Sequence, residues 1–194
     1  MNQPPLVPIH FDLSALVRKS VATFYSHLVT RPTGQALRLG IESQICELGE
    51  VCVSVLDFSQ VVVLDYSCAD EAIAKLLRRF QGDDRPGDAY FVALGVDERH
   101  LDTLETVLER QGVSLVAEVV QHGFEPLGPM EEREAEVWWE VERRNTANLD
   151  ELAAATTIPL AELPALVDHL NRRRMVIRKA DTVFALSALV TTPS

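Results

Sequence analysis

The sequence lacks the features that mark several common classes of protein. No apolar run approaches the roughly 20 residues of a membrane-spanning helix. The first residues, MNQPPLVPIHF, have neither a basic start nor an apolar segment, so we expect no secretory signal. The three cysteines, Cys46, Cys52 and Cys68, are odd in number and lack the spacing of a zinc site. Reduced thiols in a cytoplasmic protein are the simplest interpretation.

Motifs of catalysis are also missing. The chain has no Gly-rich phosphate loop, no nucleophile elbow and no zinc signature. Its five histidines lie far apart in sequence and pair with no obvious nucleophile or ligand set. We therefore predict no catalytic residue, no metal and no cofactor.

Basic charge is scarce and unevenly spread. The 194 residues hold 18 Lys and Arg against 29 Asp and Glu, a net charge of −11, which disfavours indiscriminate binding to nucleic acid or to anionic membranes. Residues 143–194, with 7 basic against 5 acidic residues, are the only locally basic part.

What the first two thirds of the chain do contain is an alternation of helical and strand patterns. Helical spacing covers residues 13–28, 37–48, 65–80 and a stretch after the capping residue Asp97; β-prone runs cover 51–57, 61–64, 89–94 and 113–120. The run Arg-Pro-Thr-Gly at 31–34 is expected to separate the first two helices. Such alternation predicts an α/β domain over residues 9–122, with a largely parallel or mixed sheet and packed helices.

Two segments flank this predicted domain. The Pro-rich residues 1–8 are expected to form a flexible arm. Residues 123–130 contain two Gly and two Pro and are predicted to be a linker.

The last third of the chain predicts a winged helix domain over residues 131–194. A helix at 131–144 carries Trp138 and Trp139, which are adjacent, so one is expected in the core and the other at a contact surface. Asn148 and Glu151 predict a capping box. A helix at 160–174 and a hairpin at 176–186 complete the arrangement.

The densest cluster of unusual residues lies at the strand-to-helix junction within residues 56–77: Asp57, Asp65, Ser67, Cys68, Asp70 and Glu71. Either Asp65 or Ser67 is expected to cap the helix. The acids match no cation-binding loop, so a solvated acidic rim is the favoured interpretation. Cys68 is expected to be buried as a small apolar side chain rather than to react.

A phosphate on Ser67 is the functional alternative to simple capping. Helix N-termini accept phosphate through their free N–H groups. Phosphorylation would add about −1.5 to −2 charges beside Asp65, Asp70 and Glu71 and would disrupt a docked surface rather than build one.

Candidate nucleic-acid contacts in the last third of the chain are two threonines and five cations: Thr156, Thr157, Arg172, Arg173, Arg174, Arg178 and Lys179. Cations at a helix C-terminus also complement its dipole without any ligand. The start of the expected recognition helix offers Pro159, Leu160, Ala161 and Glu162, which lack the side chains that usually meet base edges.

Two resemblances cover most of the chain. Residues 131–189, with the run LDELAAATTIPLAELPALVDHLNRRRMVIRKADTVFAL, resemble winged helix domains. Three segments resemble the STAS-like family, relatives of anti-sigma-factor antagonists: Thr-Arg-Pro-Thr-Gly at 30–34, Leu-Asp-Phe-Ser-Gln-Val at 56–61 and Ser-Cys-Ala-Asp-Glu at 67–71. Cys68 stands where that family tends to have an aromatic residue, and Ser67 matches the serine that a partner kinase phosphorylates in the antagonists.

These resemblances imply a protein-binding switch domain joined to a winged helix, not an enzyme. We expect a cytoplasmic bacterial regulator, with DNA binding by the winged helix as its output. The alternative is a partner-switching adaptor in which both domains bind proteins of a kinase or sigma-factor pathway, with Ser67 as the switch. An enzyme using Cys68 or the carboxylates is the weakest interpretation, and homodimerisation stays open.

Overall fold

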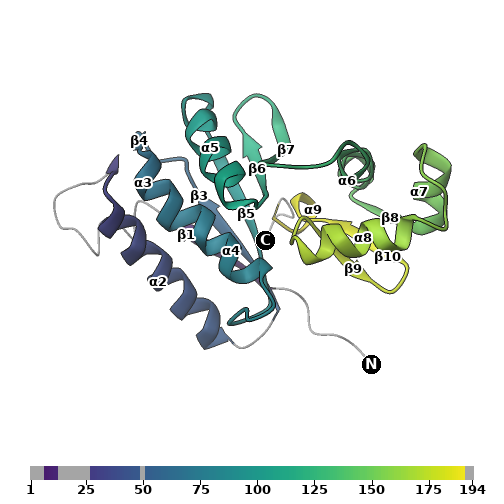
Figure 1. Ribbon diagram of the computed structural model, residues 1–194, viewed down its shortest axis with the longest axis horizontal. Coiled ribbons are helices and arrows are strands. Elements are labelled where there is room, and N and C mark those ends of the chain that lie inside the picture. Colours follow the sequence, from purple (N-terminus) through teal and green to yellow (C-terminus); the bar gives the residue numbers. More distant parts are fainter. Residues whose placement is uncertain (1–6, 13–26, 49–50, 191–194) are drawn as a thin grey trace.

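A five-stranded sheet forms the centre of the molecule (Figure 1). The computed structural model describes residues 7–12, 27–48 and 51–190. The strands, in their order across the sheet, are β1 (Val7–Asp12), β3 (Cys52–Asp57), β5 (Ala89–Val96), β6 (Leu115–Val119) and β7 (Gly123–Leu127). The first four are parallel, and β7 runs antiparallel to β6. A mixed α/β fold is thus confirmed.

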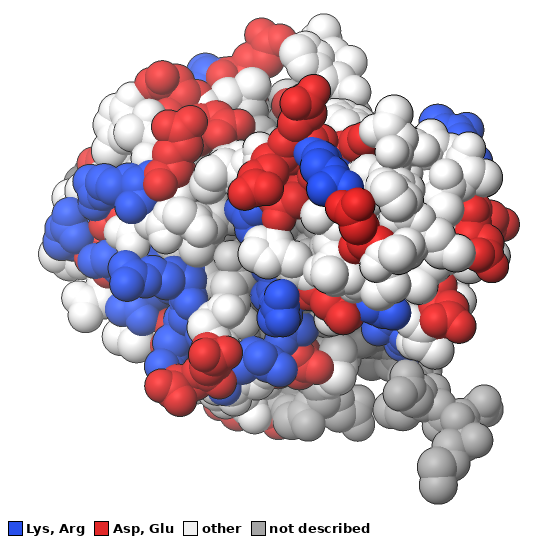
Figure 2. Space-filling view, turned by 45° about the vertical axis from the view of Figure 1, so that its right-hand side comes forward, with Lys and Arg blue, Asp and Glu red and all other residues white. Residues whose placement is uncertain are grey.

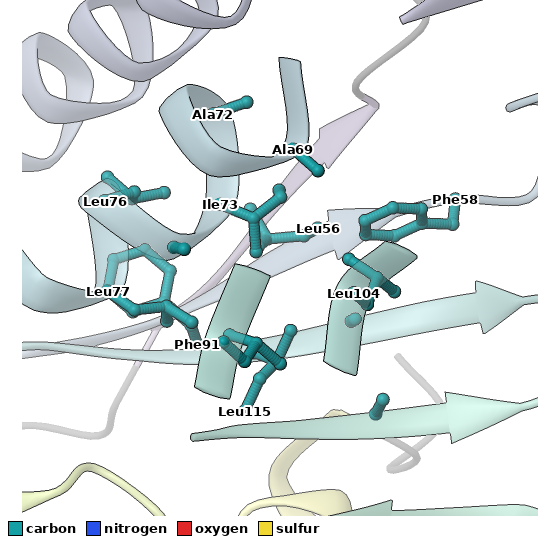
Figure 3. Close-up of a cluster of buried hydrophobic side chains, with 14 of the residues drawn as sticks. Leu56, Phe58, Ala69, Ala72, Ile73, Leu76, Leu77, Phe91, Leu104 and Leu115 are labelled. Carbon is teal, nitrogen blue, oxygen red and sulfur yellow. The ribbon is translucent and has the colours of Figure 1, made fainter. Parts of the chain in front are cut away.

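Helices cover one face of this sheet. They are α2 (Arg31–Leu48), α3 (Tyr66–Ala69), the π-helical turn η1 (Asp70–Ala74), α4 (Lys75–Gln81) and α5 (Leu101–Gln111), which the 3₁₀ turn η2 (Glu98–His100) precedes. Ile73, Leu76 and Leu104 from the helices meet Leu56 and Phe91 from the strands in one buried cluster (Figure 3). A second, two-stranded sheet pairs β2 (His27–Leu28) with β4 (Val63–Leu64).

The N-terminal boundaries differ from the sequence prediction. Helix α2 begins at Arg31 rather than after Gly34, because Pro32 lies in the first turn, where a missing N–H breaks no helical bond. Val7 and Pro8, predicted to be in a loose arm, pair with Cys52 and Val53 along the edge of the sheet. The rest of that arm, residues 1–6, and residues 13–26 of the first predicted helix lie outside the described residues.

The C-terminal unit, residues 132–190, combines helices with a three-stranded antiparallel sheet in the order β8-β10-β9. Its elements are α6 (Glu132–Arg144), β8 (Thr146–Asn148), α7 (Leu149–Ala155), α8 (Leu163–Arg172), β9 (Val176–Lys179), β10 (Thr182–Ala185) and α9 (Ser187–Val190). The capping box at the start of α7 is confirmed, since the backbone N–H of Glu151 donates to Asn148 Oδ1 over 2.8 Å and that of Asn148 donates to Glu151 Oε2 over 2.8 Å.

The segment predicted to be a linker is instead strand β7. Gly123 and Gly128 take positive φ angles of 91° and 85° at the two ends of this strand, and Pro126 lies on the sheet edge, where its missing N–H leaves no ladder bond unmade. Gly and Pro therefore mark the ends and the edge of a strand here, rather than a loose connection.

The C-terminal unit packs against the face of the central sheet opposite α2–α5. Val53, Tyr90 and Val116 from the strands share one buried cluster with Trp138 and Val167 of the C-terminal unit. The strands are therefore buried on both faces, as parallel sheets require. The expected burial of one tryptophan is confirmed, because Trp138 is 1% exposed. Trp139 is 48% exposed, and its role at a contact surface stays a prediction.

Candidate functional site

Asp65 caps the helix that begins at Tyr66. Its Oδ1 accepts hydrogen bonds from the backbone N of Cys68 and from the hydroxyl of Ser67, both over 2.8 Å. Its Oδ2 accepts from the backbone N of Thr30 over 3.1 Å, which ties the start of α2 to the start of α3. Burial alone would raise the pKa of Asp65, but these hydrogen bonds outweigh it and lower the pKa. Of the two residues predicted as caps, Asp65 has this role.

Ser67 lies within the first turn, half-buried, with its hydroxyl held by Asp65. Apolar side chains near it in sequence are exposed: Val62 is 47%, Val63 38% and Tyr66 48% accessible. We call Val62, Val63, Tyr66 and Ser67 the corner surface. Phosphorylation of Ser67 stays a prediction.

Asp57 and Cys68 have local roles. Asp57 Oδ1 accepts from the backbone N of Ser59 over 2.9 Å and so stabilises the turn after β3. Cys68 is completely buried, and burial together with the nearby Asp65 charge raises the pKa of its thiol to about 12. Its expected burial is thereby confirmed.

Asp70 and Glu71, the buried acid pair, are not part of a solvated rim. They are only 1% and 6% exposed. Glu71 Oε1 lies 2.7 Å from Arg31 Nη1 and also contacts Lys75 Nζ. Asp70 Oδ1 lies 2.9 Å from Arg110 Nη2. For Asp70 and Glu71 the prediction of a solvated rim is wrong, because these cations replace the water that an exposed carboxylate would need.

Electrostatics keep the acid pair ionised. The pKa of Glu71 is lowered first by its hydrogen bond with Lys75, against an opposing effect of burial, and further by Arg31. Burial would raise the pKa of Asp70, but a hydrogen bond from Gln111 Nε2 at 2.8 Å and the charges of Arg110, Lys75 and Arg31 lower it overall. The pair also lies on the π-helical turn η1, a type of irregularity often found at functional sites.

Segments at 30–34 and 67–71, which are distant in sequence, meet at this point. Besides the Arg31–Glu71 ion pair, Gly34 approaches the second helix so closely that a Cβ placed on it would lie 2.5 Å from the carbonyl oxygen of Cys68 and 2.9 Å from Glu71 Cβ. The absence of a side chain at Gly34 therefore sets the spacing of α2 and α3–η1.

Two of the C-terminal cations join the C-terminal unit to the central sheet. Arg174, 6% exposed, has Nη2 2.5 Å from Asp88 Oδ1 and its guanidinium carbon 4.6 Å from the Tyr90 ring centre. Arg173 Nη2 donates to Ser114 Oγ over 2.5 Å and to the Pro129 carbonyl oxygen. Both guanidinium groups are thus engaged inside the molecule.

Arg173 also contacts α6, and Arg178 connects the hairpin to α8. Arg173 Nη1 lies 2.7 Å from Glu134 Oε2. Arg178 lies 2.7 Å from Asp168 and donates to the carbonyl oxygens of Pro164 and Ala180 over 3.0 and 2.9 Å.

The remaining candidate DNA contacts divide into engaged threonines and exposed cations. Thr157 donates from its backbone N and its hydroxyl to Glu136 over 2.6 and 2.9 Å, and the hydroxyl of Thr156 donates to the Leu152 carbonyl oxygen over 2.7 Å. Arg172 and Lys179 are exposed and form no ion pair within the described residues.

The surface beside the first half of α8 is acidic and apolar. Leu160 is 47% exposed, and Glu162 pairs with Arg133 over 2.6 Å. A shallow depression of about 530 Å³ beside α8 contains Glu131, Glu134, Glu162 and Leu166. This surface would repel phosphate rather than attract it.

Several residues of these clusters escaped the sequence analysis. The partners of the acid pair include Arg38, Arg110 and Gln111, and the partners of Arg174 are Asp88 and Tyr90. Of the partners of the acid pair, only Arg31 lies in a motif that the sequence indicated, at residues 30–34. The other partners come from distant elements and have no local sequence pattern.

Comparison of the chain with protein-family models, curated proteins and solved structures found no match. Within the described residues, no helix is long and apolar enough to cross a membrane. The same residues contain no group of three or more His, Cys, Asp or Glu side chains that could hold a metal ion.

Proposed function

We propose that this chain is a non-enzymatic regulatory protein that acts by binding a partner protein. In this proposal a STAS-like unit receives the partner, and a winged helix unit is fixed to it. The resemblance of the segments at 30–34, 56–61 and 67–71 supports the first part. The helix order and the strand order β8-β10-β9, with α8 in the position of a recognition helix, support the second part.

One observation favours protein binding over DNA binding as the output. Arg173, Arg174 and Arg178, which a DNA-binding winged helix would turn towards phosphates, are engaged with Glu134, Asp88 and Asp168. Releasing Arg173 and Arg174 would break their contacts with Ser114 and Asp88, which join the C-terminal unit to the sheet. Releasing Arg178 would break a contact within the C-terminal unit. Electrostatic binding to the DNA backbone depends on free Lys and Arg side chains.

The corner surface is the proposed partner contact on the N-terminal unit. Exposed apolar and aromatic side chains are frequent anchors in interfaces, and Val62 and Tyr66 are each nearly half exposed. Ser67, with its hydroxyl already at a helix start, lies beside them. A phosphate at this position would add negative charge next to Asp65. It would therefore weaken the binding of a partner whose contact surface is acidic or apolar.

A DNA-binding regulator is the second candidate. Its support is the same order of helices and strands, together with Arg172 and Lys179, which remain exposed at the end of α8 and in the hairpin. DNA binding would require phosphate contacts from residues other than Arg172 and Lys179.

A partner can be identified by cross-linking in cells and its affinity measured with purified proteins. Val62→Asp and Ser67→Asp should weaken binding by about tenfold or more, as for a charge placed in an interface. Leu39→Asp is the matched control, since Leu39 is 51% exposed on α2 and should leave the affinity unchanged. Equal affinities for the wild-type protein and both corner variants would refute the proposed contact.

A further inference from the structure

A cleft between the two units is lined only by neutral and basic residues. We call it the junction cleft; its volume is about 490 Å³, and its lining residues are Arg78, Gln81, Gly82, Gln111, Gly112, Val113, His169, Arg172 and Arg173. No Asp or Glu is among them, although the chain has 29 acidic residues. Lys and Arg side chains also gather on the lower left part of the molecular face in Figure 2.

Two cations of this cleft, Arg78 and Arg172, form no ion pair within the described residues. Within the described residues, almost every Lys and Arg side chain forms an ion pair with a carboxylate; the exceptions are Arg78, Arg79, Arg172 and Lys179. Arg78 and Arg172 line the junction cleft, one from each unit. Arg79 lines an adjoining depression that shares Arg78 and Gly82 with it.

The position of Arg78 is set by a chain of hydrogen bonds that starts at the buried acid pair. Gln111 Nε2 donates to Asp70 Oδ1 over 2.8 Å, and Gln111 Oε1 accepts from Arg78 Nη1 over 3.0 Å. On the opposite wall, the Arg173 guanidinium is held by Glu134 and Ser114. The walls of the cleft are thus lined by guanidinium groups, two of which are oriented in advance.

We propose that the junction cleft binds a phosphate group and thereby bridges the two units. Guanidinium groups form paired, charge-assisted hydrogen bonds with phosphate oxygens, and a dianion satisfies donors on both walls at once. The volume lies within the range of small-ligand sites. Its lining residues include no Phe, Tyr or Trp on which a base would stack, so we assign recognition to the phosphate group.

A simpler account assigns the cations to helix dipoles. Arg78 and Arg172 lie in the last turns of α4 and α8, where positive charge is favourable without a ligand. That account predicts lower stability on neutralisation but no affinity for phosphate. The two accounts therefore differ in a binding measurement.

The test is calorimetric titration of the full chain with pyrophosphate at constant ionic strength. The wild-type protein should bind, and Arg78→Gln and Arg172→Gln should each weaken binding about tenfold through loss of a charge-assisted hydrogen bond. Lys179→Gln is the matched control, since Lys179 is also unpaired but is not a lining residue, and it should bind as the wild type does. A nucleoside diphosphate and a phosphoserine peptide, titrated separately, show which source of phosphate binds more tightly, and either one supports the site.

Three results would overturn the proposal. They are no binding of pyrophosphate by the wild-type protein, unchanged binding by both arginine variants, and equally tight binding of an unphosphorylated Glu-rich peptide through the same arginines. If an arginine variant shows no cooperative unfolding transition, it is not folded and its binding is uninformative. The amide chemical shifts of the wild-type protein then test the site. Pyrophosphate should then shift the Gly82 and Gly112 amides, and their insensitivity would count against the site. The site is separate from the corner surface, so its loss leaves the proposed partner contact intact.

Discussion

Arg31 Nη1 lies 2.7 Å from Glu71 Oε1, joining the first turn of α2 to the π-helical turn η1. Around this contact the acid pair, Gly34 and the Asp65 cap hold α2 and α3 together. Segments at 30–34 and 67–71 that carry the STAS-like resemblance are therefore in direct contact, and their residues hold the two helices together.

Replacing Gly34 tests the close approach of the two helices. Gly34→Ala should lower the free energy of unfolding by about 1–3 kcal/mol, the usual cost of overpacking, because its Cβ would collide with the Cys68 backbone. Gly40→Ala, in the same helix with no atom within 4 Å of the added Cβ, should instead raise it by roughly 0.5–1 kcal/mol. Urea unfolding measures both, and equal effects would contradict the packing described.

The buried acid pair predicts how stability depends on pH. The pKa values of Asp70 and Glu71 are lowered on folding from ordinary values of 3.8 and 4.5. Their contribution is therefore complete above those values and is lost as the pH falls through the lowered ones. Stability should fall as the pH drops below about 4.5.

Asp70→Asn isolates this contribution. At pH 7 it should destabilise the protein by about 2 kcal/mol, since hydrogen bonds to charged groups contribute roughly 1.5–3 kcal/mol. The difference from the wild type should shrink at acid pH, because the wild-type carboxylate is then protonated. Asp84→Asn, at an exposed position, serves as control and should change stability by less than about 0.5 kcal/mol. A difference that does not change with pH would contradict the role of the charge.

The helix cap gives a third prediction. Asp65→Ala removes the acceptor for Cys68 N and Thr30 N and should cost about 1 kcal/mol, with a range of 0.5–2 kcal/mol for caps. Ser67→Ala removes only a donor to Asp65 and should cost less than about 0.5 kcal/mol. Thermal unfolding measures the loss of stability in both variants. A larger loss for Ser67→Ala than for Asp65→Ala would show that Ser67, not Asp65, caps the helix.

Two neighbouring arginines distinguish structural cations from free ones. Arg174→Gln should lower the free energy of unfolding by about 2 kcal/mol, because it breaks the bond to Asp88 and the contact with Tyr90. Arg172→Gln, exposed and unpaired within the described residues, should change it by less than about 0.5 kcal/mol. Similar losses in chemical denaturation would show that Arg174 does not join the two units.

Local patterns in the sequence predicted local structure well. The strands at 52–57 and 89–96, the Asn148–Glu151 capping box and the division between Trp138 and Trp139 each follow from spacing or chemistry within a few residues. Such features depend on neighbouring residues, so a single sequence contains them.

Contacts between distant segments were not predictable in the same way. The partners of Asp70 come from α2, α4 and α5, so its burial depends on the fold rather than on the neighbouring acids that suggested a rim. Likewise, Arg173 and Arg174 form a basic run in sequence, and only the packed structure brings Ser114 and Asp88 to them. The Gly and Pro residues of β7 suggested a linker, because the pairing of this edge strand with β6 leaves no pattern in the local sequence.

Arg173 and Arg174 join the two units, and we propose that the protein acts through a protein partner rather than through DNA. The decisive measurement is a titration of labelled duplex DNA with the full chain, followed by fluorescence anisotropy across a series of salt concentrations. We expect the wild-type protein to retain no DNA at low salt. Tight binding that weakens steeply with salt, with a slope reduced in Arg172→Ala or Arg173→Ala, would contradict this proposal.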